Sequence, residues 1–126
     1  MVSYNSNTKI EMEIDGVKVN IDGISMKLFN ALKNVAKKSK VFTDKVNKSS
    51  NLSDDEVLKI QEEMGQVCIE FLSEVLSEEA YQKLVIDKVE DVFYLMDITS
   101  FIMIEIKSAK ANRLSRLAEQ AKRIYS

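Results

Sequence analysis

The sequence predicts a mainly α-helical protein with a short N-terminal β-hairpin, followed by three or four helices of which the last is long. Two observations lead to this fold class. The 126 residues include no proline and only three glycines, so the residues that most often interrupt helices are nearly absent. Apolar residues recur at helical spacing over residues 24–126, whereas before them they alternate with polar residues as in strands. A chain of this length corresponds to a single domain, residues 1–126, which can bury a core without disulfides or metals.

The hairpin is predicted over residues 9–22. Apolar residues alternate with glutamates from Ile10 to Ile14, and a second alternating run extends from Val17 to Ile21. The Asp15-Gly16 pair between the two alternating runs is the strongest short-range signal for a hairpin. Residues 1–8 are polar and are expected to be disordered.

Three helix starts are marked by serine residues. Ser25 is a suitable N-cap for a first helix, whose apolar stripe continues to about Lys48. Ser53 and Glu56 have the spacing of a capping box, which predicts the start of a second helix. A short third helix is expected after Ser77.

The fourth helix is predicted to begin after Asp87 and meets no helix-breaking residue before Ser126. At a rise of 1.5 Å per residue such a helix is about 58 Å long, whereas a domain of this size is only about 35 Å across. We therefore expect the helix to project from the body or to break between Lys107 and Asn112. The basic segment 107–126 still carries an apolar stripe, which would need a partner if it projected. The stripe consists of Leu114, Leu117, Ala118, Ala121 and Ile124.

The net charge of −2 conceals three blocks of alternating sign. Residues 1–52 hold nine lysines and five acidic residues, a net charge of +4. Residues 53–106 hold three lysines and fourteen acidic residues, a net charge of −11. Residues 107–126 hold six basic residues and one acidic residue, a net charge of +5. Such a chain can attract copies of itself as well as other proteins, although each block can also be a solvated face.

The helix around residues 89–106 is apolar on two sides. One broad face of the helical wheel is the expected core, and it holds Val89, Val92, Phe93, Leu95, Met96, Met103, Ile104 and Ile106. Tyr94, Ile98 and Phe101 project instead from the opposite, acidic face at i, i+4, i+7 spacing. Two interpretations stay open: the helix is central and these residues are buried, or they form a docking ridge for a helix or another copy.

No catalytic, metal or cofactor site is predicted. The chain has no histidine, which excludes Ser-His and Cys-His nucleophiles and histidine-ligated metals. The glycines are too few and too far apart for a phosphate-binding loop. The single cysteine, Cys68, lies on an apolar helix face and is expected to be a buried structural thiol. We therefore expect no enzymatic activity and no small-molecule substrate.

A cytoplasmic location is expected. The most apolar run, residues 92–106, contains two acidic residues. Spanning a bilayer takes about 20 predominantly apolar residues, which is more than this run provides. The N-terminus also lacks the basic and apolar regions of a signal peptide.

A nucleic-acid-associated regulator is the main alternative, with the C-terminal basic helix lying along phosphates. Steps of three residues rotate the basic side chains around the helix by about 60° each, so they form a spiral and not one stripe. The acidic middle of the chain would also repel the phosphate backbone. Nucleic acid is therefore the less favoured partner.

Three features of the chain together resemble a known family. They are the hairpin around Ile14-Asp15-Gly16-Val17, the run Phe71-Leu72-Ser73-Glu74-Val75-Leu76-Ser77-Glu78-Glu79-Ala80-Tyr81-Gln82-Lys83-Leu84 before the last helix, and the stretch Lys110-Ala111-Asn112-Arg113-Leu114-Ser115-Arg116. In this arrangement the chain resembles the tail assembly chaperones of Gram-positive bacteriophages and phage-derived tail particles. Ser77 stands where those proteins usually have glycine. The resemblance covers most of the chain after Lys9 and rests on pattern, without a catalytic motif.

The resemblance implies a non-enzymatic assembly factor that binds tape-measure or tail-tube protein, often as an oligomer, in the host cell cytoplasm. A structural subunit that remains in a virion or tail is a further alternative. We expect protein partners, including other copies of the chain, and no membrane. The candidate partner-binding residues are Tyr94, Ile98, Phe101, Arg113, Leu114, Arg116, Leu117 and Ile124.

Overall fold

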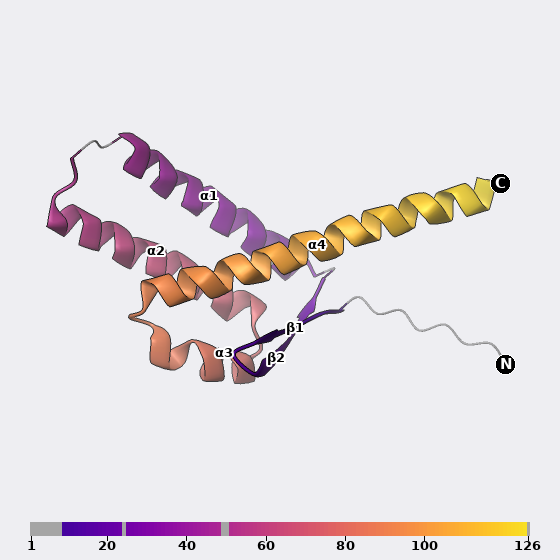
Figure 1. Ribbon diagram of the computed structural model, residues 1–126, viewed down its shortest axis with the longest axis horizontal. Helices are drawn as coiled ribbons and strands as arrows, with labels where there is room; N and C mark the ends of the chain where they lie inside the picture. Colours follow the sequence, from indigo (N-terminus) through magenta and orange to yellow (C-terminus); the bar gives the residue numbers. More distant parts are fainter. Residues whose placement is uncertain (1–8, 24, 49–50, 126) are drawn as a thin grey trace.

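The computed structural model describes residues 9–23, 25–48 and 51–125, so the expectation of disorder for residues 1–8 lies outside the described residues. The elements follow in the order β1 (Lys9–Ile14), β2 (Val17–Asp22), α1 (Met26–Lys48), α2 (Asp54–Val75), α3 (Glu78–Leu84), the 3₁₀ helix η1 (Ile86–Lys88) and α4 (Val92–Tyr125). The predicted fold class is confirmed: the protein is mainly helical, with an N-terminal hairpin and a long last helix (Figure 1).

The hairpin forms with the predicted turn. β1 and β2 pair antiparallel with Ile14 opposite Val17. Asp15 and Gly16 have φ angles of 47° and 78°, so both turn residues adopt the left-handed conformation that a type I′ turn requires. Ile14, Val19 and Ile21 are buried on the face that packs against the helices.

The predicted caps Ser25 and Ser53 are confirmed, and Ser77, predicted to start the third helix, is also an N-cap. The Ser25 hydroxyl accepts a hydrogen bond from the Leu28 backbone N–H at 3.0 Å. Ser53 accepts from Glu56 and Ser77 accepts from Ala80, each at 3.2 Å. Each bond satisfies one of the backbone donors that a helix start leaves without an intrahelical partner.

The start of the fourth helix differs from the prediction. The N-cap is Asp91, whose carboxylate accepts from the Tyr94 backbone N–H at 3.1 Å, and the predicted cap Asp87 lies instead within η1. Within the short η1 turn, the Lys88 backbone N–H donates a hydrogen bond to the Val85 carbonyl. The α-helix therefore begins only after this turn, at Val92. The prediction of Asp87 as the cap was therefore wrong by four residues along the chain.

α4 is unbroken and projects from the body. It has 34 residues, which corresponds to a length of about 51 Å. Ile106 is its last buried residue, and residues 114–125 are all exposed. Figure 1 shows this C-terminal part extending away from the other elements. It points away from the side where α1 ends at Lys48 and α2 begins at Asp54. Of the two predicted outcomes, projection is the one observed.

α2 lies at the centre of the helical layer, in contact with α1 on one side and with α4 on the other. The hairpin contacts α4 through β1 and α3 through β2. One core joins these elements, and Val19, Leu72, Leu95 and Ile102 are among its most deeply buried side chains.

The structure corrects the orientation of α4 that the helical wheel predicted. Ile98 is only 6% exposed, because the hairpin covers this side of the helix. The expected core residues Phe93 and Ile104 are instead 67% and 63% exposed, and Val89 is also exposed. α4 is covered by α2 on one side and by the hairpin on another, so its buried face is rotated from the predicted one. The burial of Ile98 supports the interpretation of a central helix.

Tyr94 connects α4 to the hairpin turn. Its hydroxyl donates a hydrogen bond to an Asp15 carboxylate oxygen at 2.9 Å, and Lys88 Nζ lies 5.5 Å from the centre of its ring. Desolvation, together with the bond to Asp15, raises the pKa of Tyr94 to about 12. Both the hydroxyl and the ring of Tyr94 therefore contact residues of the same chain.

The environment of Ile98 predicts that Ile98→Asp unfolds much of the protein. A carboxylate at this position would be buried without a cationic partner, at a cost of several kcal/mol. Typical domains have a stability of only about 5–15 kcal/mol. Circular dichroism should show a large loss of helix. Phe101→Asp is the matched control, because Phe101 is 41% exposed and its replacement should leave the helix signal unchanged. A fully helical Ile98→Asp variant would contradict the burial of this side chain.

The Tyr94–Asp15 hydrogen bond predicts a pH-dependent contribution to stability. Because the pKa of Tyr94 in the folded protein, about 12, lies above its ordinary value of 10.0, the hydrogen bond contributes fully below pH 10. The contribution is lost as the pH rises through about 12. Urea unfolding should therefore show wild type more stable than Tyr94→Phe at pH 8, with the difference shrinking as the pH rises above 10. A constant difference across this range would contradict the assignment.

Candidate protein-binding groove

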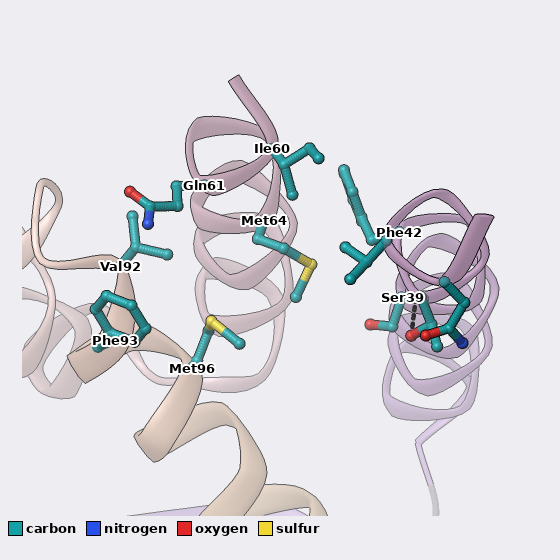
Figure 2. Close-up of a pocket in the computed structure, with 11 residues that line it drawn as sticks. Ser39, Phe42, Ile60, Gln61, Met64, Val92, Phe93 and Met96 are labelled. Atoms are coloured by element: carbon teal, nitrogen blue, oxygen red, sulfur yellow. Dashed lines mark hydrogen bonds between the residues drawn. The ribbon is translucent and has the colours of Figure 1, made fainter. Parts of the chain in front are cut away.

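An apolar groove lies where α1, α2 and α4 meet (Figure 2). α2 forms its floor, while the C-terminal half of α1 and the first turns of α4 form its walls. Its volume is about 340 Å³. We call this the helix groove, and its lining residues are Ser39, Phe42, Thr43, Val46, Asn47, Ile60, Gln61, Met64, Val92, Phe93 and Met96.

The groove exists because the pair of helices α1 and α2 extends beyond the start of α4. In α1 the last buried residue is Val35, and in α2 the first is Gly65. The parts of both helices beyond these residues therefore pack on each other without a third helix to cover them. α4 begins next to Gly65, where a Cβ atom would lie 3.3 Å from Val92 Cγ2. The absence of a side chain at Gly65 lets the first turn of α4 approach α2 closely.

The helix groove offers apolar contact. Phe93 on α4 and Val46 on α1 are both exposed, and Met64 on α2 and Met96 on α4 also line the groove. Methionine side chains are flexible and polarizable, so they adapt to the shape of an apolar partner. The Thr43 hydroxyl donates to the Ser39 backbone carbonyl at 3.0 Å and is satisfied within α1. The groove therefore presents mainly apolar side chains at its surface.

A second concave surface lies on the other side of Gln61 and Val92, which line both. Its volume is about 700 Å³, and it combines four apolar side chains with three glutamates. None of its lining residues is basic. We call this the acidic hollow, and its lining residues are Leu58, Gln61, Glu62, Glu63, Gly65, Gln66, Ile69, Val89, Glu90 and Val92.

The C-terminal part of α4 presents a third surface, and we call residues 114–125 the projecting segment. Leu114, Leu117 and Ile124 are 67%, 62% and 78% exposed, and Arg116 is also exposed. Four of the predicted partner-binding residues therefore lie together on this segment. Arg113 lies at its base and is half-buried.

Contacts of Arg113 and Lys110 hold the base of the projecting segment to the body. An Arg113 guanidinium nitrogen donates to the Gly23 backbone carbonyl at 3.3 Å. Lys110 Nζ lies 4.8 Å from the centre of the Phe29 ring, within the range of a cation–π interaction. Arg113, a predicted partner-binding residue, thus contacts its own chain at Gly23.

The three predicted ridge residues are not brought together on one free surface. Ile98 is buried, Tyr94 is half-buried and bonded to Asp15, and only Phe101 is exposed. The residues that line the helix groove were not predicted as a site. In the sequence, the groove is indicated by Phe42 and Val46, because these residues continue the apolar stripe of α1 beyond its last buried residue.

Cys68 is buried, as the sequence predicted. Burial raises the pKa of its thiol, an effect that the neighbouring Thr99 hydroxyl partly offsets. A raised pKa disfavours the thiolate, which is the reactive form of cysteine. Within residues 9–23, 25–48 and 51–125, no group of three or more potential ligands is arranged to hold a metal ion. Over the same described ranges, no helix is both long and apolar enough to cross a membrane.

Comparison with protein-family models, with curated proteins and with solved structures gives no match for this chain.

Proposed function

We propose that this protein is a non-enzymatic assembly factor that binds a helix of another protein in the helix groove. The observation that carries the proposal is the set of apolar side chains that three helices leave uncovered in one concave surface. Concave apolar surfaces of this kind mark sites where soluble proteins bind partners. An amphipathic helix inserted between α1 and α4 would pack on α2 and complete a four-helix arrangement.

The lining of the groove defines the partner's chemistry. The apolar side chains call for a helix with large apolar residues at i, i+3 or i+4, and i+7 spacing. Each such residue that becomes fully buried contributes about 1.5–3 kcal/mol before the costs of association. Polar residues from α1 and α2 border the apolar lining and can bond to the polar flanks of the bound helix. These are Ser39, Asn47 and Gln61.

The resemblance to phage tail assembly chaperones supports a more specific proposal. On that basis the protein acts in phage-type tail assembly, and the bound helix belongs to the tape-measure or tail-tube protein. Binding would cover apolar segments of the partner until tail assembly. The role is that of a chaperone and not of an enzyme.

The groove predicts which side chains determine binding of this partner. The double variant Val46→Ser/Phe93→Ser should weaken binding of tape-measure or tail-tube protein from the same genome by at least tenfold, because both apolar anchors are truncated. A loss of about 1.4 kcal/mol already corresponds to tenfold. Isothermal titration calorimetry with each purified tail protein measures the effect. Ile104→Ser is the matched control, because Ile104 is a similarly exposed apolar residue of α4 that does not line the groove.

The same measurements distinguish the alternatives. Wild-type affinity in the Val46→Ser/Phe93→Ser variant would remove the groove from the proposal. A titration with duplex and single-stranded DNA tests the nucleic-acid alternative. Micromolar DNA binding that collapses between about 50 and 200 mM salt would show phosphate contact. If neither tail protein bound and Arg116→Gln reduced DNA binding more than Leu117→Ser, the protein would be a nucleic-acid-associated regulator.

A further inference from the structure

We propose that the projecting segment of one copy binds the acidic hollow of a second copy, so that the protein associates head to tail. The inference goes beyond the proposed function, because it concerns two surfaces other than the helix groove. It assigns a partner to the apolar side chains of residues 114–125.

Charge is the first argument. The projecting segment, residues 114–125, holds three basic residues and one glutamate, a net charge of +2, whereas the hollow is lined by three glutamates and no basic residue. Glu62 and Glu90 are exposed on the hollow's surface, while Glu63 also pairs with Lys45 at 3.6 Å. Opposite net charges steer two surfaces toward each other and raise the association rate. Pairing two projecting segments would instead bring the two positive ends together, which charge disfavours.

Length and apolar character are the second argument. The hollow follows α2 from Leu58 to Ile69, which is about 17 Å at the rise of an α-helix. The projecting segment, residues 114–125, has the same length of about 17 Å. Leu58 is 57% exposed and Val89 is 45% exposed, so the hollow offers apolar contacts to the leucines of the segment. Charge would steer the encounter, and these apolar contacts would supply the affinity.

The geometry of α4 makes the contact intermolecular. The hollow includes Val92, the first residue of α4, whereas the segment is the other end of the same unbroken helix. Val92 and Leu117 are about 38 Å apart along the helix axis. The segment therefore cannot reach the hollow of its own chain. Because the two surfaces differ, a pair of copies still has one free hollow and one free segment, and association can continue into rings or filaments.

Charge-reversal variants test the inference. The hollow variant is Glu62→Lys/Glu90→Lys, and the segment variant is Arg116→Glu/Lys122→Glu. All four side chains are exposed, and circular dichroism checks that each variant keeps its helix content. In sedimentation velocity at 50 mM salt, wild type should form oligomers that weaken at 500 mM salt. Each variant alone should associate at least tenfold more weakly, because its hollow and segment then carry the same sign.

An equimolar mixture of the two variants should restore association, since each hollow then meets a segment of opposite charge. Wild type that is monomeric at high micromolar concentration in low salt overturns the inference, and so does a mixture that stays monomeric. A hollow variant that associates like wild type would show pairing between projecting segments instead.

Val46→Ser/Phe93→Ser should still self-associate, and the segment variant should still bind the tail protein. Failure of this inference is therefore distinguishable from failure of the proposed function.

Discussion

The close packing of α4 on α2 at Gly65 is the constraint on which the other features depend. Because residue 65 has no side chain, the first turn of α4 lies against the middle of α2. α2 therefore extends past α4 toward its own N-terminus, and the uncovered part becomes the floor of the helix groove. The same contact places Val92 between the groove and the acidic hollow, so one junction separates two surfaces of different chemistry.

The hairpin completes the arrangement by fixing the rotation of α4 about its axis. β1 packs on the face that holds Ile98, and the turn residue Asp15 accepts the Tyr94 hydroxyl. With α2 and the hairpin covering two sides, Phe93 is left at the mouth of the groove. The small sheet thus helps to determine which apolar residues of α4 stay exposed.

Sequence patterns predicted the local features of the fold. The Asp15-Gly16 turn and the serine caps could be predicted because each depends on residues within four positions of one another. The rotation of α4 could not, because Phe93 and Ile98 are equally apolar and the choice between them depends on contacts with the distant hairpin. Asp87 and Asp91 were both suitable caps by residue type, and the intervening 3₁₀ turn decided between them. The helix groove needs three helices in a specific arrangement, so no local pattern contains it.

The straightness of α4 has a further consequence for how the proposed contacts combine. The groove lies at one end of this helix and the projecting segment at the other, so a protein bound in the groove does not cover the segment. Copies associated through the segment would each keep an open groove. A tape-measure or tail-tube protein with several suitable helices could then bind several linked grooves, and each later contact would form at the high effective concentration set by the first. Modest affinity at a single groove of about 340 Å³ would then suffice for stable binding of a long partner.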